Sequence, residues 1–437
     1  MPYMPRQNLE HDLDVFGVIR AHIVDTIPIL ATEGLPQLTV IGAIGDEPTY
    51  RIGDVGFGTS TVTDRDIVTL GDELVNESEA VELSATHDEN FHGERQYLTY
   101  SVLRPTVPPM SRVTVSEIES VANTALVAAG AAPNVANHVA HATAVAESNG
   151  NRICGLYYLE SYCTQLVTNR VNGSVEPSVT TPRPGTVIVD ARLGFAQPAF
   201  AAGFDHAVAA ARANGICSFS VAHSHTATSL GYFTEQLALA GMIAIGATNA
   251  SPRVAPPGGS RALLGTNPIA MAVPDGAGGI AFQFDFATSA VALGTITMAA
   301  ARGETIPEGW AVDADGTPTT DPAAAVAGSM LSAGGHKGYG IGLLVEILAG
   351  ALTGSNLSAD IPALKTPEGP PHNIGQHYLV IDPTAHADGV FIERLQQLAE
   401  LVTEQPGARL PGAGRERATE VDVDDVLWTR CQELANS

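Results

Sequence analysis

The stretch from Val221 to Pro274 constrains the fold of this 437-residue chain more than any other segment. It alternates strand-like runs with glycines and carries two Thr-Asn pairs, at residues 248–249 and 266–267. Glycines in such turns let backbone amides approach a phosphate closely. Yet no Gly-x-Gly-x-x-Gly follows a strand, because the nearest match, Gly56-Phe-Gly58, lacks the third glycine and a following helix. The sequence therefore predicts that any nucleotide site is built outside the Rossmann pattern.

Composition and charge exclude several classes of protein. The net charge is −25 although only 16% of the residues are charged, because bases are few. The chain contains only two lysines, Lys337 and Lys365. An acidic protein repels phosphate backbones, so we expect no nucleic acid among its partners. The length is sufficient for two or three domains.

The cysteines and apolar runs indicate a soluble protein in a reducing compartment. The four cysteines form no Cys-x-x-Cys pair, so they predict neither a zinc site nor a redox dithiol. The first residues are polar and acidic, unlike a signal peptide. The best apolar run, Gly338 to Gly354, is short and carries Glu346 in its middle. We expect a cytoplasmic protein without a membrane span or a bound metal.

The order of elements predicts a separate N-terminal module before a larger core. Residues 1–110 contain a helical pattern over residues 13–31, then five strand-like runs and a proline-rich linker. Thr114 and Glu117 form a capping box for a helix, and Pro133 opens a second helix. We predict an α+β module at 1–110, a helical segment at 111–180, a cofactor-binding domain at 181–345 and a C-terminal helical segment at 346–437.

Five segments, in order, resemble the type 2 malate/L-lactate dehydrogenase family over about residues 112–437. They are Ala146–Gly155, Val221–Pro274, Asp285–Ser289, the run from Ile306 to Gly340, and Leu410–Gly412. This resemblance extends to relatives such as ureidoglycolate dehydrogenase, diketogulonate reductase and piperideine-2-carboxylate reductase. It implies hydride transfer between NAD or NADP and a small 2-oxo or 2-imino acid.

The resemblance also implies a fold, an assembly and a set of cofactor contacts. The expected fold is mixed α+β and non-Rossmann, with a helical layer, a largely antiparallel cofactor domain and a C-terminal helix packed back. The expected assembly is a homodimer with the active site near the interface. The implied cofactor-binding residues are Gly265, Thr266, Asn267, Phe284, Asp285, Phe286, Thr288, Ser289, Lys337, Gly338, Pro411 and Gly412. Asp285 either borders the nicotinamide or has only a structural role.

The chain departs from the family at the residues that carry the chemistry. The family's Ser-His-Gly motif places a proton-donating histidine where this chain has Cys154, beside Ile153. The family's carboxylate-binding arginine corresponds to Tyr158, and its second histidine to Thr226. Cys154 is either a proton donor or a small buried thiol. Tyr158 either donates a hydrogen bond to a carbonyl or packs in the core.

The sequence His223-Ser224-His225 offers a replacement proton donor. On a strand, residues 223 and 225 would share one face. The unperturbed pKa of histidine suits proton transfer at neutral pH, which makes His225 the first candidate. Hydrogen-bonded structural histidines are the competing interpretation.

Two functions from different classes remain open on the sequence. One is an atypical NAD(P)-dependent oxidoreductase acting on a ketone or imine of a larger biosynthetic intermediate, because the arginine that binds a simple 2-oxo acid is missing. The other is a non-redox enzyme for cyclisation, elimination or isomerisation, or a catalytically silent binding protein. Loss of three catalytic side chains motivates the second. Cofactor binding distinguishes the two.

Overall fold

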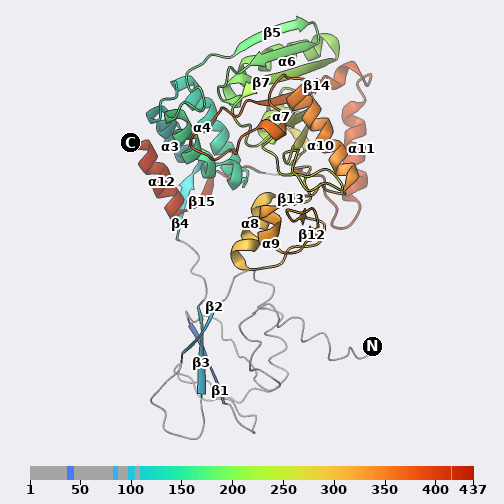
Figure 1. Ribbon diagram of the computed structural model, residues 1–437. Helices are drawn as coiled ribbons and strands as arrows, with labels where there is room; N and C mark the ends of the chain where they lie inside the picture. The colour runs from blue at the N-terminus through green and yellow to red at the C-terminus, as the bar shows by residue number, and fades with distance from the viewer. Residues whose placement is uncertain (1–36, 44–81, 87–96, 104–108, 415) are drawn as a thin grey trace. The chain divides into compact units, whose positions relative to one another are not determined.

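The computed structural model describes residues 37–43, 82–86, 97–103, 109–414 and 416–437. The chain divides into two units, Met1–Pro108 and Pro109–Ser437 (Figure 1). In the first unit, β1 (Gln37–Ala43), β2 (Glu82–Thr86) and β3 (Tyr97–Leu103) form an antiparallel sheet in the order β1-β3-β2. These strands coincide with three of the five predicted runs. The other two runs and the helix predicted at 13–31 lie outside the described residues.

A helical layer opens the second unit. It begins with β4 (Met110–Thr114), followed by α3 (Val115–Ala128) and α4 (Pro133–Ser148). The predicted capping box is confirmed, because the side chains of Thr114 and Glu117 each accept from the other's backbone amide. Pro133 occupies the first turn of α4, as predicted. Two 3-10 turns, η3 (Arg152–Cys154) and η4 (Leu156–Tyr158), lead into α5 (Leu159–Val167).

The C-terminus closes this helical layer. Strand β15 (Glu420–Asp424) pairs antiparallel with β4, and α12 (Asp425–Ala435) packs against α3 and α5 (Figure 1). Asp424 caps α12 by accepting from the amides of Val426 and Leu427. The layer buries one apolar cluster that includes Ile118, Leu126, Leu159, Tyr162 and Cys431. Residues at the two ends of the unit therefore share one core.

A seven-stranded sheet forms the centre of the second unit, in the order β10-β9-β8-β14-β7-β6-β5. Its strands are β5 (Ser178–Arg183), β6 (Thr186–Asp190), β7 (Ile216–Ser224), β8 (Ile243–Thr248), β9 (Ile269–Pro274), β10 (Ile280–Phe286) and β14 (Ile374–Ile381). Within this sheet only β6 and β7 run parallel. The predicted fold class, mixed, non-Rossmann and largely antiparallel, is confirmed.

Helices α6 (Ala196–Asn214) and α7 (Gly231–Leu239) pack on this sheet. Their shared core contains Phe200, Phe219, Phe233 and Tyr378, each almost fully buried. Helix α6 begins at Ala196, and its first two turns bury apolar side chains against the sheet.

Strand β14 corrects the predicted boundary at residue 345. It comes from the segment predicted to be a C-terminal helical part, yet it lies between β8 and β7. Its polar residues Gln376 and His377 are buried and obscure the apolar pattern expected of a central strand. The segments 181–345 and 346–437 therefore build one sheet and not two separate parts.

The remaining elements of the second unit are α8 (Leu293–Arg302), β11 (Ala311–Val312), β12 (Pro318–Thr319), α9 (Pro322–Ala327), β13 (Ser329–Met330), α10 (His336–Glu346), η5 (Ile347–Ala351), η6 (Ser358–Asp360), η7 (Pro383–Ala385) and α11 (Phe391–Thr403). The apolar run that begins at Gly338 lies in α10, an α-helix, and continues in η5, a π-helical turn.

Candidate functional site

The turn that carries Cys154 is held by a buried carboxylate. Glu147, in the last turn of α4, accepts a hydrogen bond from the Leu156 amide at 2.8 Å. Burial raises the pKa of Glu147. A Cβ at Gly155 would overlap this carboxylate, so the close approach requires glycine. The turn therefore fixes the positions of Cys154 and Tyr158.

The structure brings Cys154 and Asp285 together. Asp285 ends β10 and accepts hydrogen bonds from the Gly231 amide at 2.8 Å and the Ser229 hydroxyl at 3.3 Å. Its side chain remains accessible, but packing around the carboxyl raises its pKa. Burial, with Asp285 nearby, raises the pKa of Cys154 to about 12. Cys154 is therefore a neutral thiol and not a thiolate nucleophile.

Tyr158 and Tyr162 form the aromatic wall beside Cys154. Their rings stack with centroids 5.9 Å apart. Tyr158 is half-buried, and this burial, with smaller effects from Cys154 and Tyr157, raises its pKa to about 12. The positive charge of Arg253 acts in the opposite direction. The buried hydroxyl of Tyr162 faces Thr226 without a hydrogen bond of good geometry to any described residue.

Thr226 lies in this cluster, as predicted for the site. It is buried and has a φ of 27°, in the left-handed region that a β-branched residue rarely adopts. Its hydroxyl accepts weakly from the Thr228 amide at 3.4 Å. Four predicted residues therefore gather here: Cys154, Tyr158, Thr226 and Asp285.

His225 does not take part in this cluster as a proton donor. Its ring is fully enclosed, stacked on His372 with centroids 4.2 Å apart and edge-on to Phe195 and Tyr162. Neither ring nitrogen has a hydrogen-bond partner among the described residues. Burial, with His372 and Arg170 nearby, lowers its pKa well below the ordinary value. The ring is enclosed in the core as a neutral side chain, which argues against the predicted proton transfer.

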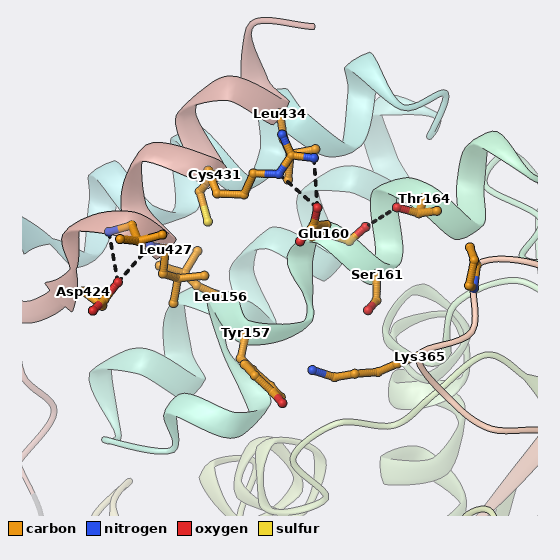
Figure 2. Close-up of a pocket in the computed structure, with 13 residues that line it drawn as sticks. Leu156, Tyr157, Glu160, Ser161, Thr164, Lys365, Asp424, Leu427, Cys431 and Leu434 are labelled. Atoms are coloured by element: carbon orange, nitrogen blue, oxygen red, sulfur yellow. Dashed lines mark hydrogen bonds and ion pairs between the residues drawn. The ribbon is translucent and has the colours of Figure 1, made fainter. Parts of the chain in front are cut away.

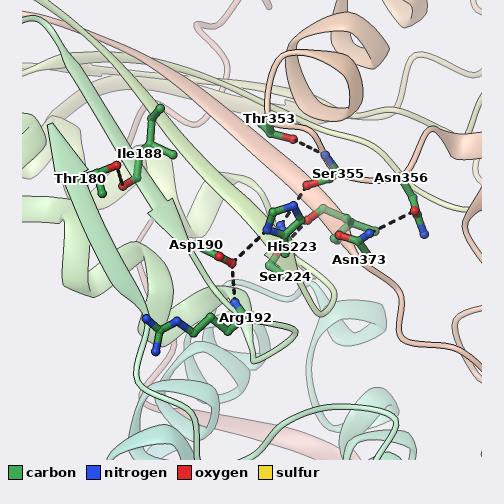
Figure 3. Close-up of polar contacts among 11 residues, drawn as sticks. Thr180, Ile188, Asp190, Arg192, His223, Ser224, Thr353, Ser355, Asn356 and Asn373 are labelled. Carbon is green, nitrogen blue, oxygen red and sulfur yellow. Dashed lines mark hydrogen bonds and ion pairs between the residues drawn. The ribbon is translucent and has the colours of Figure 1, made fainter. Parts of the chain in front are cut away.

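The prediction that residues 223 and 225 share one face is wrong. His223 has a φ of 53°, and the pairing of β7 with β14 shifts register beside it. The bulge turns His223 outward, where its Nδ1 lies 3.0 Å from an Asp190 carboxylate oxygen (Figure 3). Its backbone amide donates to the Ser355 hydroxyl. The two histidines therefore lie in opposite environments.

Glycines on the other side of β10 allow close backbone packing. A Cβ at Gly265 would overlap the Ala250 carbonyl, and one at Gly338 would overlap the Ala333 carbonyl. Gly412, with a φ of 69°, packs against Gln283, whose amide donates to the Pro411 carbonyl at 2.9 Å. The Gly412 contact thus holds one predicted cofactor segment against β10, and the other two contacts fix Gly265 and Gly338 against neighbouring backbone.

The side chain of Asn267 is committed to the interior. Its amide nitrogen donates to Glu346 at 2.7 Å and to the Gly342 carbonyl at 3.1 Å. Its amide oxygen accepts from the Ser358 hydroxyl at 3.2 Å, and Ser358 also donates to Glu346. The residue is fully buried. This network fixes α10 in place. Because the side chain of Asn267 is used in it, only the backbone of Asn267 could make the predicted cofactor contact.

Thr266, Thr288 and Ser289 connect the same segments. The Thr288 amide and hydroxyl both donate to the Thr266 carbonyl, at 2.8 Å and 3.1 Å. The Ser289 hydroxyl donates to the Val291 carbonyl at 2.8 Å. Thr288 and Ser289 are buried, whereas Thr266 is partly exposed. The hydroxyls of Thr288 and Ser289 thus stabilise the loop, and Thr266 remains open to a ligand.

A flat apolar surface and a free cation complete this region. Phe284 and Phe286 stack with centroids 4.8 Å apart, and Phe286 is 51% exposed. Lys337 is exposed in the first turn of α10 and forms no ion pair with a described residue. Glycine-permitted backbone approach, an aromatic surface and a cation at a helix N-terminus match the chemistry of a dinucleotide. The residues present therefore fit NAD or NADP.

Sequence reasoning missed three residues near the tyrosines. Arg253 lies close enough to Tyr158 to favour its ionised form, and Lys365 lies over Tyr157. Tyr162 was not singled out either, because a lone tyrosine in a helix is typical of a core. The scarcity of lysine was a signal for Lys365, whereas nothing local distinguished Arg253.

No group of three or more His, Cys, Asp or Glu side chains within the described part of the chain could hold a metal ion. In the same part, no helix is both long enough and apolar enough to cross a membrane.

A largely antiparallel sheet without a Rossmann turn, together with residues that fit a dinucleotide, is typical of a non-Rossmann oxidoreductase. Residues 113–428 match the sequence profile described as malate/L-lactate dehydrogenase. The chain belongs to the malate/L-lactate dehydrogenase family, whose members are NAD(P)-dependent oxidoreductases.

Two relatives show the extent of the similarity. The chain is 40% identical over 308 residues to (2R)-3-sulfolactate dehydrogenase (NADP(+)) of Chromohalobacter salexigens, covering 70% of this chain and 91% of that protein. It is 37% identical over 336 residues to the Delta(1)-pyrroline-2-carboxylate/Delta(1)-piperideine-2-carboxylate reductase of Pseudomonas putida, covering 76% and 97%.

Solved structures agree with this assignment. The delta1-piperideine-2-carboxylate reductase of Pseudomonas syringae superposes with a TM-score of 0.69 at 33% identity, over 74% of this chain and 99% of that one. The sulfolactate dehydrogenase of Methanocaldococcus jannaschii superposes with a TM-score of 0.69 at 28% identity, over 75% and 97%. The family resemblance inferred from sequence motifs is confirmed.

Proposed function

We propose that this NAD(P)-dependent oxidoreductase reduces a ketone or imine of a biosynthetic intermediate larger than a simple 2-oxo acid, with Tyr158 as the proton donor. The observation that carries the proposal is the cluster of Tyr158, Cys154 and Asp285 beside the dinucleotide region. The relatives act on sulfolactate and on cyclic imino acids by their names. This chain replaces the side chains that their family uses for that chemistry.

The cofactor would be held by the segments described above. Lys337 and the glycine-permitted loops would bind its phosphates and ribose, and the Phe284–Phe286 surface would support its ring. When bound, NAD(P)H supplies a hydride to the substrate carbon. Gly231 and Ser229 orient the Asp285 carboxylate at the edge of this surface.

Tyr158 is suited to give a proton to the substrate. Its phenol is neutral, with a pKa of about 12, and a developing alkoxide is more basic than the phenolate that transfer leaves behind. The positive charge of Arg253 favours that phenolate. Solvent can then restore the proton, because Tyr158 is only half-buried. Tyr162 lacks this access, and His225 is enclosed in the core.

The non-redox alternative rests on the same substitutions. The residues that replace the family's histidines are a neutral thiol and a threonine, neither of which is a strong general base. A site of this kind could bind a ligand without moving a hydride. Cofactor binding separates the two functions.

The test is titration of the purified protein with NADH and with NADPH, following nicotinamide fluorescence. Binding of NADH or NADPH at micromolar to millimolar concentration supports the assignment as an oxidoreductase. A loss of nicotinamide absorbance after a carbonyl substrate is added would then demonstrate hydride transfer. Absence of binding of both cofactors at millimolar concentration contradicts the proposal and favours the non-redox alternative.

We further propose a homodimer in the cytoplasm. Helix α10 and the following turn expose a row of apolar side chains: Ile341, Leu343, Leu344, Ile347 and Leu352. Such a face is typical of a subunit interface. All four cysteines are free, which suits a reducing compartment. Sedimentation equilibrium of the full chain tests the assembly: a dimer is expected, and a monomer at high micromolar concentration contradicts it.

A further inference from the structure

A pocket of about 550 Å³ lies beside Tyr157 and Lys365 (Figure 2). It lies between α5, α12 and the loop that carries Lys365. Its walls are apolar along one side, where leucines line it, and its polar groups include three hydroxyls, two carboxylates and two cations. The two cations are Lys365 and Arg430.

The loop that carries Lys365 is fixed to α5 and the residues after it. The buried guanidinium of Arg170 donates to the carbonyls of residues 363, 366 and 370. Gln165 donates to the carbonyls of residues 364 and 366, and Thr168 to that of residue 367. The guanidinium of Arg170 is thus bonded to backbone carbonyls and not to a carboxylate. This set of bonds presents Lys365 at a defined place.

Lys365 lies over the aromatic pair. Its Nζ is 3.0 Å from the ring centroid of Tyr157 and 5.1 Å from that of Tyr158. Cation–π contact orients the ammonium group but does not neutralise it. Lys365 forms no ion pair with any described residue, and Figure 2 shows the Ser161 hydroxyl pointing toward it.

The other charges of the pocket are already paired. Arg430 donates to Glu160 at 2.9 Å and to Glu433 at 2.9 Å. Asp424 caps α12 through two backbone amides. Lys365 is therefore the uncompensated charge of the pocket, in a chain with a net charge of −25. An anion is the ligand that this arrangement lacks.

We propose that this pocket binds a remote acidic group of the substrate, with the Lys365 ammonium and the Ser161 hydroxyl as its ligands. The inference rests on the proposed function, which it extends to a substrate class. Tyr157 and Lys365 line the pocket, whereas Tyr158 and Cys154 do not, so a group bound there lies apart from the proposed proton donor. The acid is thus separated from the reacting carbon, as in a 4-oxo or 5-oxo acid and unlike a 2-oxo acid. Leu156, Leu427 and Leu434 line the space for its carbon chain.

The experiment compares an acid with its neutral ester. Steady-state reduction of levulinate, a 4-oxo acid, and of methyl levulinate is measured with the full chain and the cofactor that it binds. Lys365→Gln is expected to raise KM for levulinate about tenfold or more and to leave kcat and the ester unchanged. Lys365→Arg should restore most of the loss, and Ser161→Ala should raise KM severalfold. Arg183→Gln removes the same charge from the edge strand β5 and should change nothing.

Calorimetric titration of levulinate into the enzyme–cofactor complex gives a second readout that does not need turnover. Binding that weakens in Lys365→Gln and persists in Arg183→Gln supports the inference. Equal effects of Lys365→Gln on acid and ester, or no levulinate binding to the complex, would overturn it. Those outcomes do not contradict the proposed oxidoreductase function, because cofactor binding is measured separately. Failure to bind either cofactor instead contradicts the proposed function.

Discussion

The two sides of the candidate site use their polar groups in opposite ways. On the cofactor side, formed by residues 265–267, 288–289 and α10, the buried side chains of Asn267, Thr288 and Ser289 bond to other parts of the protein. On the substrate side, formed by the η3–η4 turn, Tyr162 and Thr226, the hydroxyl of Tyr162 finds no good partner. The thiol of Cys154 stays neutral there, and the charges of Arg253 and Lys365 are unpaired among the described residues.

This difference explains which motifs the chain shares with its family. A buried polar network fails if one member is lost, because the remaining groups are left without hydrogen bonds. Residues in such a network resist substitution whether or not a ligand binds. Replacing an unpaired group on the substrate side leaves no buried partner without a hydrogen bond. Substitutions that fit another substrate are therefore tolerated on this side. Substitutions on the two sides should therefore have different effects on stability and on turnover.

The largest effect is expected from Tyr158→Phe. If Tyr158 donates the proton, kcat for the reduced carbonyl compound should fall about 10²–10⁴-fold, with cofactor affinity unchanged. Steady-state kinetics and a cofactor titration measure the two quantities. Tyr157→Phe, which changes the neighbouring ring in the same way, should retain kcat. Normal turnover by the Tyr158→Phe enzyme would show that Tyr158 is not the proton donor.

On the cofactor side, Asn267→Ala should lower the free energy of unfolding by about 3 kcal/mol, because it removes the buried hydrogen bonds of Asn267 with Glu346, Ser358 and the Gly342 carbonyl. Denaturant unfolding of the full chain measures this change. The matched variant is Tyr162→Phe on the substrate side. It removes a hydroxyl that has no good hydrogen bond, so stability should stay equal or rise. Equal losses in both variants would contradict the contrast.

Acid should weaken the substrate side through His372, which packs on His225 beneath Tyr162. Burial lowers the pKa of His372 to about 3 in the folded chain. As the pH falls below the ordinary value of about 6.5, the unfolded chain binds a proton that the folded chain does not. Stability is therefore lost progressively between these two values, by about 2 kcal/mol at pH 5.

His372→Phe keeps a flat ring against His225 and removes this titration. The free energy of unfolding of this variant should fall less on acidification than that of the unmodified chain. At pH 5 the difference between the two losses should be about 2 kcal/mol. Burial lowers the pKa of His377 to about 4, so it contributes a separate pH dependence that remains in both proteins. Parallel pH profiles for the two proteins would show that His372 titrates normally in the folded state.

The smallest effect is expected from Lys337→Gln. An exposed cation that contacts a cofactor phosphate or ribose should contribute about 1.5 kcal/mol, or roughly tenfold in affinity. Fluorescence titration with NADPH measures the dissociation constant, and unfolding should be unchanged because Lys337 has no partner in the described protein. Unaltered affinity would place the cofactor away from the start of α10.

Much of the fold could be predicted from local patterns. The capping box at Thr114 and the helix start at Pro133 follow from short-range rules. Strand β14 was missed because its central position comes from pairing with β7 and β8, which no local pattern encodes. The bulge at His223 was missed for the same reason, and it reversed the expected orientation of the two histidines.

Residue identities at fixed places in the motifs were enough to identify the family and to predict that Cys154, Tyr158 and Thr226 stand where its catalytic side chains would be. Which groups lie near these three residues depends instead on long-range packing. Arg253 and Lys365 reach the tyrosines from segments distant in the chain, and His225 is excluded by the rings that enclose it. Proximity and burial set the charge and accessibility of a side chain, and both arise from long-range packing.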